Sequence, residues 1–390
     1  MPPSAAGGQT VIYLDYNATT PLHPEVRAAM MPHLGDEFGN PSSAHRLGAR
    51  ARVAVETARV QVAAAVAAGA SEIVFTSGGT EASNLAIQGA AASREGAIVT
   101  TPIEHSSVLQ PIAALKHAGR RVRELRVDGA GRIDVDDLRR CLSEPVALVS
   151  IGWANNEIGT IAPVAEVSAL CRAAGVLLHI DAVQAFGKIA VAVAPADLMS
   201  LSGHKIGGPK GVGALWVRGG VRIEPRLLGG PQERGLRAGT ENVAGIVGFG
   251  AACQLAASGV AAGETIAGLR ERLWQRLAAS VGGLSRNSPP VGCLPNTLNV
   301  RVAAMRGEAL VAALDLEGVA VSTGSACAAG AAEVSHVLRA IGIAEDDARD
   351  GLRFSLGRGT TSAEIERAAE LVAMCVARIR AVRGREAAHA

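Results

Sequence analysis

The stretch EIVFTSGGTEASN, residues 72–84, decides the fold class. It begins with a short apolar run that is typical of a buried strand, and a Gly-Gly turn then leads into a helical pattern. A helix that starts there points free backbone N–H groups and its positive dipole end at the turn, so Gly79 and Thr80 are candidates for binding an anion. A plain N-capped helix would explain the segment equally well, and these residues alone leave that alternative open.

Further apolar runs of strand length follow this stretch. They are AIVTT (97–101), VALVSI (146–151), VLLHID (176–181), DLMSL (197–201) and VGALWV (212–217). Amphipathic helical patterns, such as those at 107–118 and 163–174, lie between several of them. Alternation of helices with continuously apolar strands predicts an α/β fold, in which a mainly parallel sheet has helices on both faces. Ligands of such sheets bind at the carboxyl ends of the strands.

The pattern changes after about residue 260. Long helical patterns at 262–280 and 362–381 flank short strands near 296–301, 319–322 and 351–356. This arrangement predicts a second, smaller α+β domain. We predict that residues 16–260 form the large domain and that residues 1–15 and 261–390 form the small one.

The composition excludes several classes of protein. Of 390 residues, 48% are hydrophobic but only 3% are aromatic, so the core must consist of Ala, Val, Leu and Ile. The 38 basic and 36 acidic residues give a net charge of +2, which calls for no nucleic acid. The six cysteines are scattered without a CxxC pair, so we expect neither a zinc site nor a disulfide framework, but a reducing cytosol.

Neither the N-terminal segment nor the longest uncharged run of the sequence predicts a membrane protein. The start MPPSAAGGQT has no basic and apolar regions of the kind that form a signal peptide. The uncharged run 242–263 is long enough to span a bilayer, but it contains five glycines together with Asn, Gln and Ser. We therefore expect this run to be a buried helix and expect no membrane partner.

Polar residues follow the predicted strands at the points where the strands end. His105 comes after 97–101, and Asn155 and Asn156 come after 146–151. Asp181 ends the run 176–181, with Gln184 three residues later. The segment after 197–201 contributes Ser202, His204 and Lys205. A single His here would more often be structural, and a lysine in a Gly-rich turn is usually only solvated.

Together these strand ends offer an anion cradle, an imidazole, an amide, a carboxylate and an amine. Neither a P-loop nor a GxGxxG fingerprint follows any predicted strand. Pyridoxal 5'-phosphate matches the whole set. Its phosphate needs the cradle, its aldehyde needs a lysine, its pyridine nitrogen needs an acid, and its ring can stack on imidazole.

The sequence resembles the cysteine desulfurases of the NifS/IscS type, which belong to the class V aminotransferases. Eleven stretches resemble that family in order along nearly the whole chain: YLDYNATTP, NPSSAHRLG, FTSGGTEASNLAI, EHSSV, NNEIGT, HIDAVQAFGK, SGHKIGGPKGVG, RAGTEN, GSAC, SHVLRAIG and RFSLGR. The resemblance implies the type I fold of pyridoxal-phosphate-dependent transferases, with a seven-stranded type of sheet and a homodimer. It departs from the family at Tyr16 of DYNATT and in the CAAG that follows GSA.

The resemblance implies a role for each polar residue toward the cofactor. Lys205 would bind the aldehyde, a choice that spacing alone could not make against Lys210. Asp181 would pair with the pyridine nitrogen, Gln184 would contact the ring hydroxyl, and His105 would stack on the ring and act as an acid or base. Four residues would hold the phosphate: Gly79, Thr80, Ser202 and His204.

Other roles concern the substrate and the second subunit. Asn156, also placed beside the cofactor, and Arg353 of RFSLGR would bind the substrate carboxylate, a task that suits arginine. Thr240 of RAGTEN would reach the phosphate of the neighbouring subunit. No residue set suggests a metal ligand.

Cys327 lies in VSTGSACAAG, residues 321–330, among Gly, Ser and Ala. Taken alone, it could be an incidental cysteine in a surface loop. By the resemblance it is the nucleophile that takes sulfur from L-cysteine, leaves L-alanine and passes a persulfide to an acceptor. The small residues would let this loop travel, as in the longer-loop branch of the family.

The sequence leaves the sulfur acceptor open. An iron-sulfur scaffold for cluster assembly and a relay for tRNA thiolation are both compatible with it. Selenocysteine lyase activity is an alternative, as is a non-catalytic subunit of an iron-sulfur assembly complex. A simple transaminase would not need Cys327.

Overall fold

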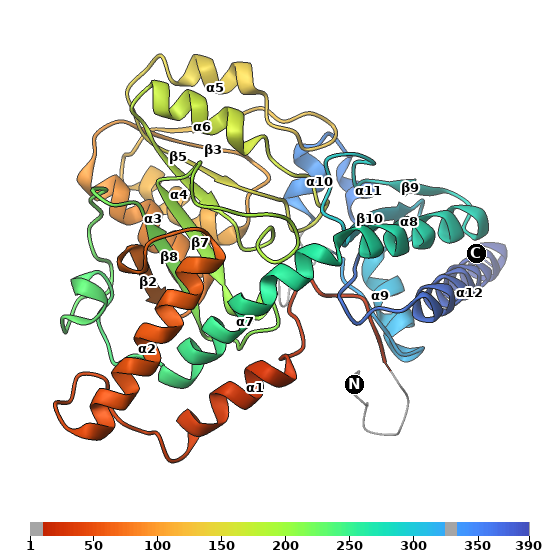
Figure 1. Cartoon of the computed structure of the whole chain (residues 1–390). Coiled ribbons are helices and arrows are strands. Elements are labelled where there is room, and N and C mark those ends of the chain that lie inside the picture. The colour runs from red at the N-terminus through yellow and green to blue at the C-terminus, as the bar shows by residue number, and fades with distance from the viewer. Residues whose placement is uncertain (1–10, 324–333, 390) are drawn as a thin grey trace.

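The computed structural model describes residues 11–323 and 334–389 and contains one large sheet beside a smaller α/β region (Figure 1). The large sheet has seven strands in the order β2-β8-β7-β6-β5-β3-β4. Neighbours pair in parallel except at β8, which is antiparallel to β2 and β7. The strands are β2 (Ile73–Thr76), β3 (Ala97–Thr100), β4 (Val122–Glu124), β5 (Val146–Gly152), β6 (Leu177–Asp181), β7 (Leu198–Ser202) and β8 (Gly213–Val217). The predicted mainly parallel α/β sheet is confirmed.

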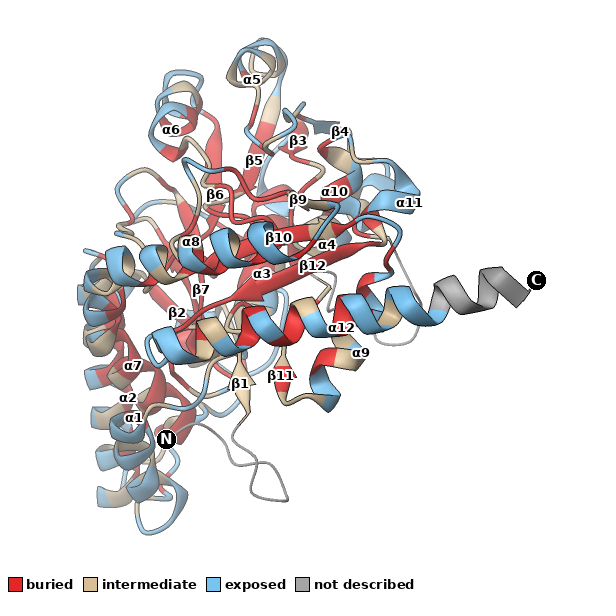
Figure 2. Cartoon of the chain, turned by 90° about the vertical axis from the view of Figure 1, so that its right-hand side faces the viewer, coloured by how far each residue is buried: buried red, intermediate tan, exposed pale blue. Residues whose placement is uncertain are grey.

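Helices cover both faces of this sheet, which explains why its strands are apolar throughout. Successive strand residues point to opposite faces, so Val74 packs with α3 (Gly79–Ser93) and α4 (Ser106–His117). Ile73 and Phe75 belong to the core on the other face. That face is covered by α2 (Arg46–Ala65), α6 (Val164–Ala173) and α7 (Val243–Ala261). The buried strands lie between these helices in Figure 2.

The remaining elements of the first 260 residues are short. They are α1 (Pro24–Met30), α5 (Val135–Cys141) and the 3-10 turns η1 (Met31–Leu34), η2 (Ala70–Glu72), η3 (Gly203–Lys205) and η4 (Gln232–Gly235). The edge strand β4 was not predicted, because its three residues, Val-Arg-Glu, are largely exposed and show no apolar run.

The predicted apolar helix at 242–263 is present as α7. By length and composition alone, this is the one helix in the described part of the chain that could cross a membrane. However, 56% of its apolar window is buried, and it packs against α2 and α1. A core helix accounts for this composition.

A second core is built mainly from the chain after residue 260, together with Leu14. Its antiparallel sheet has the order β12-β10-β9, with β9 (Leu284–Arg286), β10 (Thr297–Val302) and β12 (Gly351–Ser355). Helices α8 (Gly263–Ser280), α9 (Gly307–Leu316) and α12 (Ser362–His389) pack on it, and β1 (Ile12–Tyr13) pairs with β11 (Val319–Ala320). Two short helices follow, α10 (His336–Ala340) and α11 (Glu345–Ala348). The division of the chain into domains at residue 260 stays a prediction.

Candidate active site

A cavity of about 290 Å³ lies where β3, β5, β6 and β7 end. It is called the smaller cavity below. Nine of the residues predicted from the strand ends and from the resemblance line it: Gly79, Thr80, His105, Asn156, Asp181, Gln184, Ser202, His204 and Lys205. The parallel arrangement of these strands brings their carboxyl ends to one edge of the sheet, so residues from five segments meet in one place.

One end of the smaller cavity is suited to an anion. No side chain in the described part of the chain caps the N-terminus of α3, so backbone N–H groups of its first turn stay available. The hydroxyl oxygen of Ser202 is buried and has no hydrogen-bond partner among the described residues. A Cβ at Gly79 would lie 2.7 Å from Cγ2 of Val183, so any larger residue there would force a neighbouring side chain to shift. A phosphate group would satisfy the N–H groups and the Ser202 hydroxyl together.

Asp181 lines the smaller cavity at the end of β6. It is 8% exposed, and its Oδ1 accepts a hydrogen bond from the Val183 N–H at 2.9 Å. Burial raises the pKa of Asp181 to about 6, although the Val183 hydrogen bond and the charge of Lys205 oppose this shift. A carboxyl in this setting gains from a cationic N–H partner, so Asp181 fits the pyridine nitrogen of the predicted cofactor.

The imidazoles of this cavity are held neutral. Burial and the nearby charges of Lys205 and His336 lower the pKa of His105 to about 4, and its Nδ1 lies 2.7 Å from Oγ of Ser107. Burial, together with the charges of Lys205 and Lys210, also lowers the pKa of His204 to about 4. A neutral His105 can cover an aromatic ring and can accept a proton during a reaction.

Lys205 enters the cavity from η3, directly after β7. Its Nζ donates to the main-chain oxygens of Asn17 at 2.5 Å and Ala18 at 2.9 Å. The other candidate, Lys210, is exposed and does not line the smaller cavity. The aldehyde of the predicted cofactor therefore has one lysine within the smaller cavity, so the residues present fit pyridoxal phosphate at each of its polar groups.

Sequence reasoning missed Glu104, which lines the same cavity next to His105. Its carboxylate accepts hydrogen bonds from Thr101 Oγ1 and from the N–H of Gly152, each at 2.7 Å. Burial raises the pKa of Glu104 to about 8, and the charge of Asp181 adds to that shift. The only signal in the sequence was its place beside His105 in EHSSV.

Sequence reasoning also missed Asn17, although DYNATT contains it. Asn17 is 1% exposed, and its main-chain oxygen accepts from Lys205 and from Nε2 of Gln184. Its side-chain Oδ1 accepts from Lys188 at 2.8 Å and from Asn296 at 2.9 Å. Asn17 therefore links the strand-end residues to the second core.

Arg353 lies next to the smaller cavity but does not line it. It is 2% exposed and donates to the main-chain oxygen of Asn156 at 3.0 Å and to Oδ1 of Asp15 at 2.7 Å. On β12, its backbone pairs with Ser322, which precedes Cys327 by five residues in the sequence. The role predicted for Arg353 toward a substrate carboxylate stays a prediction.

Two further predicted residues, Cys327 and Thr240, are not among those that line the smaller cavity. Cys327 lies outside the described residues. Thr240 is exposed, and it does not line the cavity of its own subunit.

The chain matches known proteins over nearly its whole length. Residues 12–368 match the class-V aminotransferase family. A cysteine desulfurase from Trichormus azollae is 47% identical over 96% of this chain and 94% of its own length. The cysteine desulfurase IscS of Anaeromyxobacter sp. (strain Fw109-5) is 48% identical over 95% of this chain and 93% of its own.

Solved structures agree with these relatives. A NifS-like protein superposes with a TM-score of 0.89 and 36% identity, covering 94% of this chain and 99% of its own. A structure described as SspA in complex with cysteine has a TM-score of 0.79 and 35% identity, covering 90% of this chain and 99% of its own.

The raised pKa of Glu104 predicts a pH dependence of stability in the cofactor-free protein. Because the folded pKa is about 8 and the ordinary value is 4.5, the folded state holds a proton between these values that the unfolded chain has released. The free energy of unfolding should therefore decrease as the pH rises through this window. The neutral variant Glu104→Gln should lack this loss and should be more stable than the wild type at pH 8 by on the order of 4 kcal/mol.

Urea unfolding of the cofactor-free protein at several pH values between 4.5 and 8 measures this difference. The matched control is Glu124→Gln on the exposed edge strand β4, which should follow the wild type at every pH. A difference between Glu104→Gln and the wild type that stays constant with pH would contradict the assignment of a titrating Glu104.

Proposed function

The chain belongs to the class-V aminotransferase family and is a cysteine desulfurase, and from this premise we propose that pyridoxal phosphate binds in the smaller cavity and that sulfur leaves as a persulfide on Cys327. The observation that supports this best is the meeting of nine predicted residues in one cavity that also has an uncapped helix N-terminus. When bound, the cofactor would supply an electron sink for a carbanion at the substrate Cα.

We assign each step at the cavity to residues of this chain. Lys205 would hold the cofactor through its aldehyde, and its amine would be the base that removes the proton from the substrate Cα. Asp181 maintains the positive charge of the pyridine nitrogen. His105 covers the ring and moves protons, which its low pKa permits because the neutral imidazole is the form present at pH 7.

The substrate carboxylate is assigned to Arg353 and Asn156. The guanidinium of Arg353 already donates to the Asn156 main chain, so the two residues are adjacent. Its ion pair with Asp15 holds the side chain in place. A bidentate arginine orients a carboxylate at both oxygens, and this would fix the cysteine substrate with respect to Lys205.

Cys327 is assigned as the sulfur nucleophile. Its thiolate attacks the sulfur of L-cysteine, the substrate C–S bond breaks, and the electrons of that bond pass to carbon, which is protonated to give L-alanine. Cys327 then has one additional sulfur to transfer to an acceptor. The other thiols suit this task poorly, since burial raises the pKa of Cys141, Cys171 and Cys253.

Replacement of Cys327 by serine tests this assignment. We expect Cys327→Ser to bind the cofactor normally but to release sulfide and alanine from L-cysteine at least about 10³-fold more slowly, because the covalent path is lost. Assays of both products measure the rates, and mass spectrometry of the wild type should find one added sulfur on the peptide that contains residue 327. Cys141→Ser is the matched control and should retain wild-type rates. Added sulfur on another cysteine, or an undiminished rate in Cys327→Ser, would exclude Cys327.

We also assign Thr240 to the site of a second subunit. The segment 226–242, at the left of Figure 1, is anchored on its own subunit by Glu233, whose carboxylate pairs with buried Arg59 at 2.7 Å and accepts from the Phe75 N–H. Arg237 pairs with Glu81 in the first turn of α3. Thr240 is exposed and lies outside the cavity of its own subunit, as this assignment requires.

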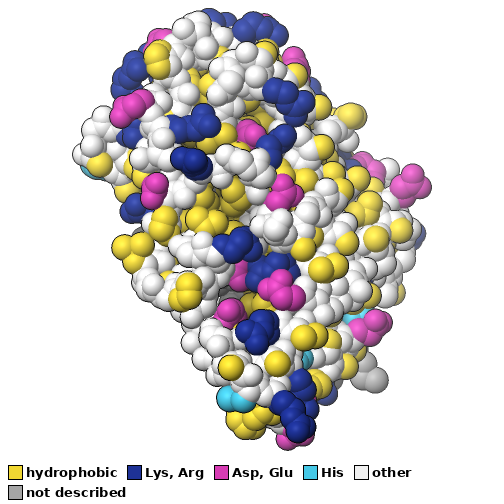
Figure 3. Space-filling view, turned by 60° about the vertical axis from the view of Figure 1, so that its left-hand side comes forward, with side chains coloured by type: hydrophobic (Ala, Val, Ile, Leu, Met, Phe, Trp, Pro, Cys, Tyr) yellow, Lys and Arg dark blue, Asp and Glu magenta, His cyan; other side chains and the backbone are white. Residues whose placement is uncertain are grey.

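The surface around this segment supports a homodimer. Leu228 is 80% exposed and its neighbour Leu227 is 49% exposed. Hydrophobic side chains are interspersed with charged ones across the face that Figure 3 shows. Exposed apolar side chains of this size on an anchored segment are typical of a protein-protein contact.

Mixed dimers test the role of Thr240. Lys205→Ala and Thr240→Ala subunits should each be nearly inactive alone. A heterodimer of the two should regain one intact site, since one cavity then receives a wild-type Lys205 and a wild-type Thr240. Activity measured after subunit exchange gives the result, with heterodimers verified by differently sized tags. Heterodimers that form without regaining activity would show that Thr240 does not act across an interface.

We propose a cytoplasmic location and a protein acceptor for the sulfur, such as an iron-sulfur scaffold. The five described cysteines are all free thiols, which suits a reducing compartment. Some relatives bear the name cysteine desulfurase IscS. A persulfide needs a thiol acceptor, so a scaffold with exposed cysteines fits the chemistry.

A further inference from the structure

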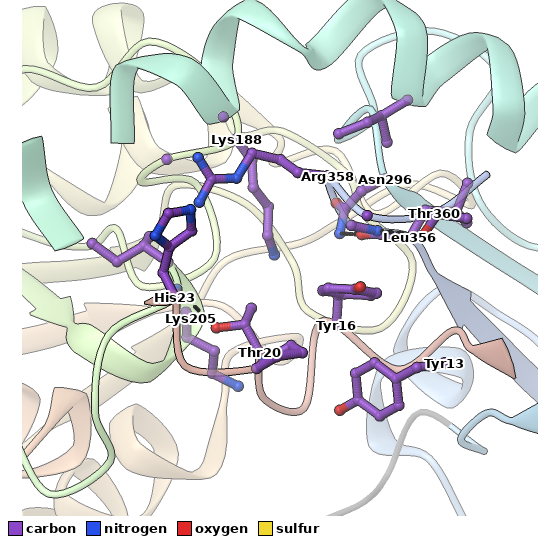
Figure 4. A pocket seen from close by; sticks show the side chains of 18 of the residues that line it. Tyr13, Tyr16, Thr20, His23, Lys188, Lys205, Asn296, Leu356, Arg358 and Thr360 are labelled. Carbon is purple, nitrogen blue, oxygen red and sulfur yellow. Dashed lines mark hydrogen bonds between the residues drawn. The ribbon is translucent and has the colours of Figure 1, made fainter. Parts of the chain in front are cut away.

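A second cavity, of about 800 Å³, adjoins Lys205 and is called the larger cavity here. Figure 4 shows that the side chains of Lys188 and Lys205 both reach into it, with Tyr16 and Asn296 across from them. Lys205 lines both cavities, whereas Lys188 lines only the larger one. The proposed function gives no task to Lys188.

Lys188 lies in an unusual environment for a lysine. No carboxylate in residues 11–323 and 334–389 forms an ion pair with it. Burial lowers the pKa of Lys188 well below its usual range, and the charges of Lys205 and Arg353 act in the same direction. Burying an amine without a counter-ion is unfavourable, so its hydrogen bonds indicate what it does there.

The amine of Lys188 donates to two amide oxygens, Oε1 of Gln184 at 2.6 Å and Oδ1 of Asn17 at 2.8 Å. In both contacts the Lys188 amine is the donor, and a donor can meet an amide only at its oxygen, because the amide NH₂ group has no lone pair to accept with. Both amides are therefore fixed in one of their two orientations. A flip of Gln184 would place an NH₂ group against the Lys188 amine.

The fixed orientation decides what Gln184 presents to the smaller cavity. Its oxygen is engaged by Lys188, and one of its N–H groups donates to the main-chain oxygen of Asn17 at 3.0 Å. The second N–H of the same amide remains for a group in the smaller cavity, which Gln184 lines. Gln184 would then act there as a donor, not as an acceptor.

We propose that Lys188 is a positioning residue, which fixes the Gln184 amide so that its N–H donates to the ring oxygen of the bound cofactor. This inference rests on the proposed function, because it needs pyridoxal phosphate in the smaller cavity with its ring hydroxyl near Gln184. Lys188 acts only through its hydrogen bond to Gln184 and does not line the smaller cavity.

The visible absorbance of the bound cofactor reports this hydrogen bond. A donor stabilises negative charge on the ring oxygen and thereby weakens the hold of the adjacent lysine-linked nitrogen on its proton. Replacement of Lys188 by methionine removes one of the two hydrogen bonds that orient the Gln184 amide and leaves only its contact with the Asn17 main-chain oxygen. The absorbance changes with pH as the lysine-linked nitrogen loses its proton. In Lys188→Met the pH midpoint of this change should therefore rise by about one unit, which corresponds to the free energy of one hydrogen bond to a charged group.

A double-mutant cycle distinguishes positioning from general damage. In a Gln184→Leu background the donor is already lost, so addition of Lys188→Met should cause no further shift of the midpoint. Lys188→Arg keeps a donor-only head and should restore the wild-type midpoint. Lys116→Met, on the exposed side of α4, is the control and should match the wild type. The melting temperature of each cofactor-free variant reports folding separately.

The outcomes separate the inference from the function on which it rests. An unchanged midpoint in Lys188→Met, or equal shifts with and without Gln184, would overturn the positioning role while the wild type still shows a visible band. If the wild type binds no pyridoxal phosphate, the proposed function and this inference are both overturned. Should Lys188→Met fail to fold, Lys188→Gln replaces it, and the same upward shift is expected.

Discussion

The site depends on the buried amide of Asn17, which connects its two sides. The main-chain oxygen of Asn17 accepts from Lys205 and Gln184, and its side-chain nitrogen donates to Thr297 on β10. Its backbone N–H donates to Ser355 on β12. Buried polar groups are costly when unpaired. The hydrogen bonds of this single residue therefore connect the strand ends of the large sheet to the strands of the second core. The residues that line the smaller cavity all come from positions 18–205, so Asn17 connects this cavity to the second core from outside.

The electrostatics of the cavity follow from the same burial. His105 and His204 are kept neutral, whereas burial raises the pKa of both Asp181 and Glu104. The site therefore disfavours unpaired negative charge on its carboxyls and surrounds its contents with the donors of Lys205, the α3 N-terminus and Ser202. This combination favours a ligand that brings its own anionic phosphate and a cationic ring nitrogen.

Much of this arrangement follows from the sequence, because polar residues after apolar parallel strands must meet at one edge of a sheet. Gly79, His105, Asp181 and Lys205 were found in this way, while β4 and β9 were missed because they are three-residue strands without a buried run. Lys188 follows Gln184 by four residues, a spacing that could have indicated contact only if the turn between them were known. The hydrogen bonds of Asn17 to Asn296 and Thr297 join residues about 280 positions apart, so no local pattern predicts them.

The central claim is that the cofactor binds covalently to Lys205 at the end of β7. The chain has four lysines, and of these only Lys205 lines the smaller cavity, while Lys188 and Lys210 lie outside it. Borohydride reduction of the yellow holoprotein, followed by peptide mapping, identifies the attached lysine directly. We predict the label on Lys205 alone and its loss in Lys205→Ala. Label on Lys188 or Lys210 in the wild type would contradict it.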